Sequence, residues 1–160
     1  MLQISFTSNI YFVAYIFLRN NVCIFQVIIK VYFFYIFRYL HVFIAKNSVQ
    51  QAMQLIQLCP EKSWLNIQND LGQTPLHLAS YVNSNDIVML LIHFGASIEL
   101  TDKDGKNVFH LCAERGHIES FEAIVRMAYQ TGQMQTVFQL LNSRDFEGMN
   151  SNLNFTLMNY

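Results

Sequence analysis

The chain has 160 residues, the length of one ordinary domain, and a formal net charge of −1. This near-neutral sum combines two different segments, because residues 1–46 carry +4 and the remainder carries −5. All eleven acidic residues lie in the second segment, which has no basic stripe interleaved with aromatic residues. This composition argues against direct nucleic-acid binding.

Residues 1–46 are rich in aromatic side chains and contain no Gly, Pro, Asp or Glu. The stretch NVCIFQVIIKVYFFYIFRYLHVFIA is long enough to span a bilayer, but Lys30 and Arg38 interrupt it. Each charge would cost about 3 kcal/mol near the bilayer centre. The first basic residue, Arg19, follows the first apolar stretch, which is not typical of a signal peptide. Two interpretations stay open: residues 10–45 associate with a membrane, or the segment is not native to the domain.

A regular pattern begins at residue 47. In SVQQAMQLIQLC, apolar residues recur at helical spacing before Pro60 ends the run. These residues are Val49, Met53, Ile56 and Leu58 or Cys59. The pattern predicts one short amphipathic helix within a partial unit over residues 47–65.

The next stretch repeats itself. GQTPLHLAS at residues 72–80 has a weaker copy, GKNVFHLCA, at residues 105–113. One constant shift carries His77 onto His110, and seven positions keep their identity or character under it. A period of about 33 residues with T-P-L-H-x-A indicates ankyrin repeats. We therefore predict an all-α ankyrin-repeat solenoid, with full units at 66–98 and 99–143 that each contain a β-hairpin loop and two antiparallel helices.

The residue types of the motif suit the start of a helix. Thr74, or Asn107 in the copy, can accept a backbone N–H at the N-cap, and Pro75 suits the first helical position. The two histidines are expected to hydrogen-bond neighbouring loops. Structural roles are therefore predicted for Gly72, Thr74, Pro75, His77, Gly105 and His110.

A further unit begins near residue 144. LNSRDFEGMN repeats the Asp-x-x-Gly entry of TDKDG, but Gly148 follows Gly105 by more than one period, so about ten residues are inserted within MAYQTGQMQTVFQ. Ser151 and Asn152 stand where the motif has proline and leucine, so no inner helix is predicted after residue 150. We expect a partial unit at 144–150, a disordered tail at 151–160, and a truncated solenoid of marginal stability.

Three stretches resemble the inhibitor-of-κB family, the Cactus-like inhibitors of Rel/NF-κB factors. They are WLNIQNDLGQTPLHLA, GASIELTDKDGKNVFHLCAERGHIES, and LLNSRDFEG after its lengthened connection. The resemblance covers about residues 47–150 and implies a cytoplasmic signalling protein that binds without catalysis. Such a protein covers the basic nuclear-localisation segment of a Rel dimer. The family's Asp-Ser-Gly degradation element does not occur in this sequence, so the resemblance does not extend to regulated degradation.

The implied partner-binding residues are those that the repeat leaves free, at hairpin tips and at the exposed ends of inner helices. They are Asp70, Leu71, Gln73, Tyr81, Val82, Lys103, Asp104, Lys106, Glu114 and Arg115. Asp102 is expected instead to brace its own hairpin. The acidic balance of this segment is compatible with a basic partner, whose binding should weaken as salt rises.

Catalytic and metal sites are not predicted. HLCAERGH brings His110, Cys112 and His117 close together but lacks the spacing of zinc ligands. No phosphate-binding glycine loop or nucleophile elbow occurs, and no cofactor is expected. The alternative function is a membrane-tethered ankyrin adaptor, in which residues 10–45 insert and the repeats recruit another protein.

Overall fold

The computed structural model describes residues 36–59 and 61–150. The chain is helical over residues 36–45, and a short 3-10 helix, η1 (Lys62–Asn66), follows the next helix. The remaining helices are α3 (Val49–Gln57), α4 (Pro75–Tyr81), α5 (Asn85–His93), α6 (Val108–Arg115), α7 (Ile118–Gln130) and α8 (Met134–Asn142). Within the described residues there is no strand, only an isolated bridge between Arg144 and Asn150. The predicted all-α ankyrin solenoid is confirmed.

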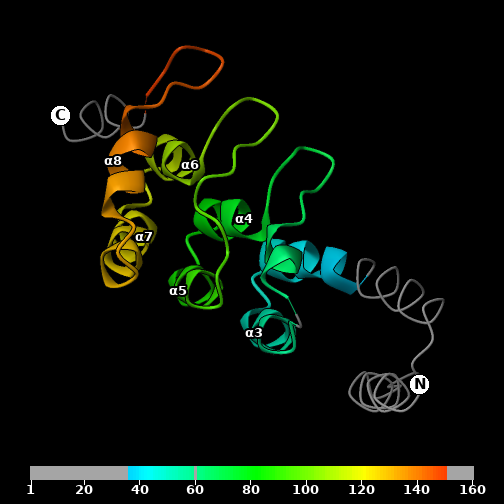
Figure 1. Cartoon of the computed structure of the whole chain (residues 1–160). Helices are drawn as coiled ribbons and strands as arrows, with labels where there is room; N and C mark the ends of the chain where they lie inside the picture. Colours follow the sequence, from blue (N-terminus) through cyan, green and yellow to red (C-terminus); the bar gives the residue numbers. More distant parts are fainter. Residues whose placement is uncertain (1–35, 60, 151–160) are drawn as a thin grey trace, which may run out of the picture. The chain divides into compact units, whose positions relative to one another are not determined.

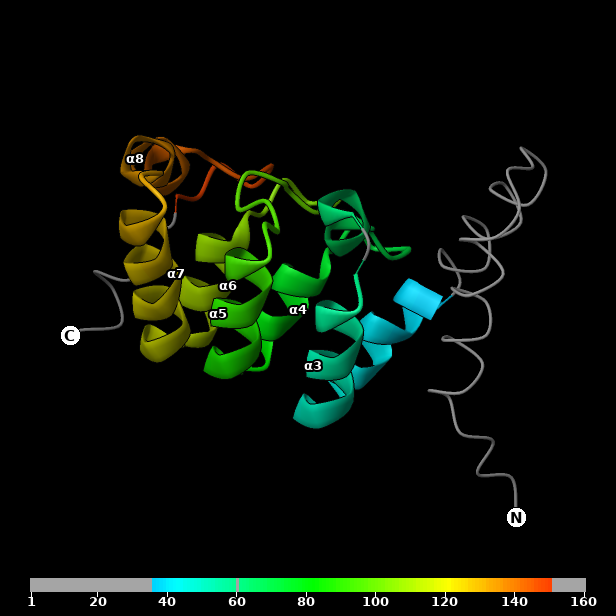
Figure 2. The same cartoon turned by 60° about the horizontal axis from the view of Figure 1, so that its bottom comes forward.

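The helices form two layers (Figure 1, Figure 2). The inner layer contains the helix over residues 36–45, α4 and α6, and the outer layer contains α3, α5 and α7. Helix α5 packs between α3 and α7, while α4 packs against both α5 and α6. Long loops project from the inner layer, so each unit presents a hairpin beside the start of its inner helix.

Equivalent apolar positions build the core between units. Leu76 of α4 and Phe109 of α6 are one sequence period apart, and both are fully buried. Ala79 and Cys112 are also fully buried, where small side chains allow the helices to approach closely. The period found in the sequence therefore corresponds to layers that cover one another.

The first repeat begins earlier than the predicted boundary at residue 47. Phe37, Leu40 and Ile44 are all buried, and the ring of Phe37 lies 5.7 Å from that of Trp64. The helix over residues 36–45 is thus the inner helix of a repeat whose outer helix is α3. Its aromatic composition had grouped it with the preceding segment, because it lacks the Thr-Pro pair that marks α4.

Helix α3 differs from its prediction in the side that it buries. Ala52, Leu55 and Ile56 are buried, whereas Leu58 lies beyond the helix end and is 40% exposed. Neighbouring helices select this face, so it is turned slightly from the apolar stripe that spacing alone suggested.

The insertion becomes helical structure. Helix α7 has 13 residues against nine in α5, and after Gly132 the chain turns into α8. Helix α8 packs against α7, and its Val137 side chain is buried. The Asn107 side-chain amide donates to the Leu140 carbonyl and the Ser143 hydroxyl, both at 3.0 Å. Asparagine at this cap thus ties the insertion to the start of α6 through two amide donors, whereas a threonine hydroxyl has one donor.

Membrane insertion was predicted only for residues 10–45. No helix within the described ranges is both long enough and apolar enough to cross a bilayer. Residues 10–35 and the predicted tail at 151–160 lie outside those ranges.

Candidate protein-binding surface

Each hairpin is closed by one side-chain oxygen at its entry. The Asp102 carboxylate accepts the backbone N–H groups of Asp104 and Lys106 at 3.0 and 2.9 Å. Asn69 and Asp145 make the same pair of contacts two and four residues ahead of themselves. The three hairpins therefore share the same pair of side-chain hydrogen bonds. Asp102 stabilises its own hairpin, as predicted.

Adjacent hairpins are joined through their backbones. The Lys103 N–H donates to the Leu71 carbonyl at 3.1 Å, and the Phe146 N–H donates to the Asp104 carbonyl at 3.0 Å. Gly72 permits the first contact because it has φ +74° and because a Cβ there would lie 2.8 Å from the Lys103 nitrogen. The hairpin row is therefore held in register by close backbone approach.

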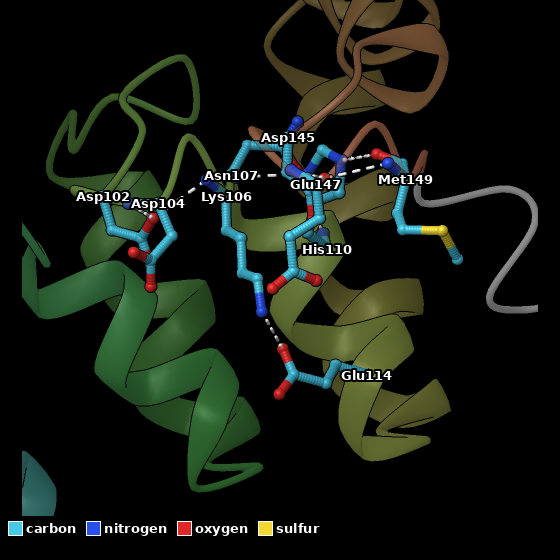
Figure 3. A network of polar contacts seen from close by, with 9 residues as sticks. All are labelled: Asp102, Asp104, Lys106, Asn107, His110, Glu114, Asp145, Glu147 and Met149. Carbon is cyan, nitrogen blue, oxygen red and sulfur yellow. Dashed lines mark hydrogen bonds and ion pairs between the residues drawn. The ribbon is translucent and has the colours of Figure 1, made fainter.

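Histidines link each inner helix to two hairpins. The Thr74 N–H donates to Nδ1 of His77 at 3.2 Å, so the proton of the neutral ring lies on Nε2, which faces the Lys106 carbonyl at 3.3 Å. Asn107 and His110 repeat this arrangement, with His110 Nε2 at 3.2 Å from the Met149 carbonyl (Figure 3). Burial lowers the pKa of His77 below its usual 6.5 and so favours the neutral ring that this network requires.

His41 is the first member of the histidine series and was not predicted from the sequence. Its Nε2 lies 3.0 Å from the Gln73 carbonyl, the residue equivalent to Lys106 and Met149. Burial also lowers the pKa of this ring. The signal was present, because Leu40-His41 precedes Leu76-His77 by little more than one period.

All six predicted structural residues are buried, whereas the predicted partner-binding residues lie at the surface. Asp70, Leu71, Tyr81, Lys103, Asp104, Glu114 and Arg115 are exposed, and Gln73, Val82 and Lys106 are partly buried. These residues divide between the hairpins and the C-terminal ends of α4 and α6. They therefore line the side of the repeats formed by hairpins and inner helices.

Several of these residues contact one another. The Lys106 ammonium lies 2.9 Å from the Glu114 carboxylate (Figure 3), and the Arg115 guanidinium lies 4.0 Å from the centre of the Tyr81 ring. The hydrogen bond that the Lys106 ammonium donates to the Glu114 carboxylate raises the pKa of Lys106, and Glu147 adds a smaller Coulombic contribution in the same direction. The surface thus alternates cationic and anionic groups across neighbouring repeats.

Three surface residues escaped the sequence prediction. Arg38 pairs with Asp70 at 3.1 Å. Glu147, on the third hairpin, lies near Lys106 of the second hairpin (Figure 3). Phe146 is 81% exposed at a hairpin position equivalent to Lys103. Phe146 could have been recognised in the sequence as the equivalent of Lys103, because each follows the aspartate at the entry of its hairpin. Its exposure could not, because that depends on how the third hairpin stacks.

The described residues contain no group of three or more His, Cys, Asp or Glu side chains that could hold a metal ion. Burial raises the pKa of Cys112 to about 12 and that of Cys59 to about 11. Both are free thiols, and at neutral pH they lack the thiolate character of a nucleophile.

Comparisons with known proteins identify this architecture. Residues 40–134 match the family described as "Ankyrin repeats (3 copies)". The chain is 33% identical to NF-kappa-B inhibitor alpha of Mus musculus over 111 residues, which are 69% of this chain and 34% of that protein. It is 34% identical to the NF-kappa-B p105 subunit of Rattus norvegicus over 87 residues, which are 54% of this chain and 8% of that protein. The chain thus spans about a third or less of these relatives.

A solved structure shows the same fold. The crystal structure of the ankyrin repeat domain of Bcl-3, described as a unique member of the IkappaB protein family, matches with a TM-score of 0.65 and 26% identity. The match covers 75% of this chain and 50% of that one.

Proposed function

Because the chain belongs to the ankyrin-repeat family and resembles its IκB-like members, we propose that it binds a Rel-type transcription-factor dimer and retains it in the cytoplasm. Binding uses the exposed hairpin tips and inner-helix ends and involves no catalysis. The partner contributes its basic nuclear-localisation segment, and masking that segment prevents nuclear entry.

The observation that carries this proposal is the separation of two residue sets on one repeat. Side chains that brace the helix caps and hairpins, such as those of Thr74, His77 and Asp102, are buried, while the side chain of Leu71, whose residue is 62% exposed, lies at a hairpin tip. Ankyrin-repeat proteins are typically interaction modules, and the described residues offer no activated nucleophile or metal cluster. The names of the alpha relatives describe inhibitors of NF-kappa-B, which supports a Rel-type partner.

Electrostatics favour a basic segment on this surface. Asp104 and Glu147 are exposed on adjacent hairpins, and Asp70, which pairs with Arg38, is still 94% exposed at its side chain. Lys106 is already paired with Glu114, so it does not leave an isolated positive charge. A basic peptide along the hairpins would therefore meet acidic side chains on successive repeats, and its attraction would be screened by salt.

The test measures binding of the full chain to a purified Rel dimer that carries its basic segment, by isothermal titration at low and high salt. We expect saturable binding that weakens with salt and on neutralising the basic segment. Leu71→Ala combined with Asp104→Asn should weaken binding at least about tenfold, a change of about 1.4 kcal/mol. Asp86→Asn, at an exposed position on the outer helix α5, is the matched control and should leave binding unchanged. A folded chain that shows no binding at low salt would refute the proposal.

Retention is tested separately in cells. Co-expression should move a fluorescent Rel factor from the nucleus to the cytoplasm, and the Leu71→Ala, Asp104→Asn variant should not. A Rel factor that binds the chain in solution yet stays nuclear would contradict the masking mechanism alone.

The membrane-tethered adaptor has less chain available than the sequence suggested. Residues 36–45 pack within the first repeat, so only residues 10–35 would be left to insert. Carbonate extraction of the full chain discriminates the two functions, since a tethered adaptor stays with the membrane fraction.

A further inference from the structure

The outer face of α7 differs from the equivalent face of α5. Val88 and Ile92 of α5 are buried, but their equivalents one period later, Phe121 and Val125, are only partly buried. Helix α5 contacts the outer helices α3 and α7, whereas within the described residues α7 contacts one outer helix, α5, together with α6 and α8. Phe121 and Val125 are therefore less covered than their equivalents on α5, although the Phe121 ring lies 5.3 Å from that of Phe109 in α6.

These positions form an apolar groove of about 420 Å³ at the end of the described stack. Phe121, Val125, Tyr129 and Met134 line it, together with Glu122 and Arg126. Tyr129 is 75% exposed, and Ile118, which extends the stripe toward the start of α7, is 50% exposed. Ile118, Phe121, Val125 and Tyr129 follow a spacing of three and four residues, which places them along one side of a helix.

The charged residues beside the groove are arranged for a self-complementary contact. Glu122 and Arg126 are four residues apart on the solvent side of the apolar stripe, and neither forms an ion pair within the described part of the chain. When two copies of a helix meet antiparallel about a two-fold axis, the same flank of each faces its mate. An axis near residue 124 then brings Glu122 of each copy to Arg126 of the other.

The apolar stripe satisfies the same symmetry. Phe121 and Tyr129 lie four residues before and four residues after Val125. A two-fold axis at Val125 would therefore bring Phe121 of each copy to Tyr129 of the other. The symmetry centre of the charged pair, near residue 124, and that of the apolar stripe, at Val125, differ by one residue, or about 1.5 Å along the helix. Side chains can accommodate this difference. Such an isologous contact closes after two copies.

We propose that α7 is a homodimerisation surface on which a second copy of this chain docks antiparallel, burying Phe121, Val125 and Tyr129 between paired Glu122 and Arg126 side chains. The contact continues the outer layer from one copy into the other. The surface is separate from the hairpin tips, so it does not depend on the proposed Rel partner.

The test is sedimentation velocity of the full chain with charge-exchange variants. We expect a monomer–dimer equilibrium that Glu122→Arg or Arg126→Glu weakens at least about tenfold, because like charges then face each other. The double variant Glu122→Arg, Arg126→Glu should restore the dimer, and a mixture of the two single variants should form a heterodimer. Leu71→Asp at the hairpin tip is the matched surface control and should leave the equilibrium unchanged.

Two results would overturn the proposal. One is a chain that remains monomeric up to about 100 μM. The other is a chain that dimerises only after residues 151–160 are removed, because the tail would then be the occupant of the groove. Val125→Asp, checked for folding by circular dichroism, should abolish the dimer; a folded Val125→Asp dimer would place the interface elsewhere.

Discussion

The first and second repeats reach the same packing from different sequences. In α4, Thr74 and Pro75 start the inner helix, and Leu76-His77 follow. The helix over residues 36–45 has Arg38 and Tyr39 at the corresponding positions, yet Leu40 is fully buried and His41 reaches the next hairpin as His77 does. The leucine–histidine pair therefore makes the contact between repeats, while the Thr-Pro pair starts the helix.

The largest expected effect tests whether the two repeats share one core. Leu40→Ala and Leu76→Ala should each lower the free energy of unfolding by about 2–5 kcal/mol, because each leaves a cavity at a fully buried site. Urea denaturation followed by circular dichroism measures both. Val42→Ala, at a position 41% exposed on the same helix as Leu40, is the control and should change stability by less than about 1 kcal/mol. An unchanged stability for Leu40→Ala would exclude residues 36–45 from the cooperative fold.

A second experiment compares glycines in equivalent hairpins. Gly72 and Gly148 both have positive φ, so alanine should cost about 1–2 kcal/mol at either position. At Gly72 the new Cβ would also meet the Lys103 backbone nitrogen at 2.8 Å, while at Gly148 nothing lies within 4 Å. Gly72→Ala should therefore destabilise the chain more than Gly148→Ala does in thermal melts. Equal effects would mean that backbone contact between hairpins contributes little.

Acid should weaken the links between repeats before it affects carboxylates. Burial lowers the folded-state pKa of His41 and His77 below 6.5, so the unfolded chain binds protons first as the pH falls through that value. Stability is complete above about pH 6.5 and then decreases, by up to about 1.4 kcal/mol per pH unit for each histidine. Urea midpoints between about pH 7.5 and pH 5.5 measure the slope.

The control for this pH dependence is the double variant His41→Gln, His77→Gln. It should be less stable at neutral pH, because the flexible glutamine side chain does not hold its acceptor and its donor in the fixed positions of the two imidazole nitrogens, but its stability should vary less with pH. A wild-type chain with constant stability over that range would show that the histidines do not couple the repeats in their neutral form.

The smallest effect is expected from the ion pairs on the hairpin side. Arg38–Asp70 and Lys106–Glu114 are both solvent-exposed in at least one partner. Asp70→Asn and Glu114→Gln should each change stability by less than about 1 kcal/mol, and the difference should shrink further in high salt. If Asp70→Asn lowers the free energy of unfolding by well over about 1 kcal/mol, the Arg38–Asp70 pair contributes more to joining the first two repeats than an ordinary surface ion pair does.

The two full repeats could be predicted from sequence because their signals are local. A glycine at positive φ, a capping residue and a buried histidine recur at one spacing, and each acts within a few residues of itself. The first inner helix was not recognised because its contacts with Gln73 and Trp64 join residues that are far apart in the chain. Composition assigned it to the aromatic segment, since composition records residue type without recording which face becomes buried.

The sequence by itself determined the ankyrin period, the hairpin entries at Asn69, Asp102 and Asp145, and the helix caps, because these depend on spacing and short-range hydrogen bonds. Only the tertiary structure decided that residues 36–45 belong to a repeat, that the insertion folds as α8, and that the apolar stripe of α7 is uncovered within the described residues. Burial at those places depends on which helix lies opposite. That neighbour is chosen by packing between segments distant in the chain.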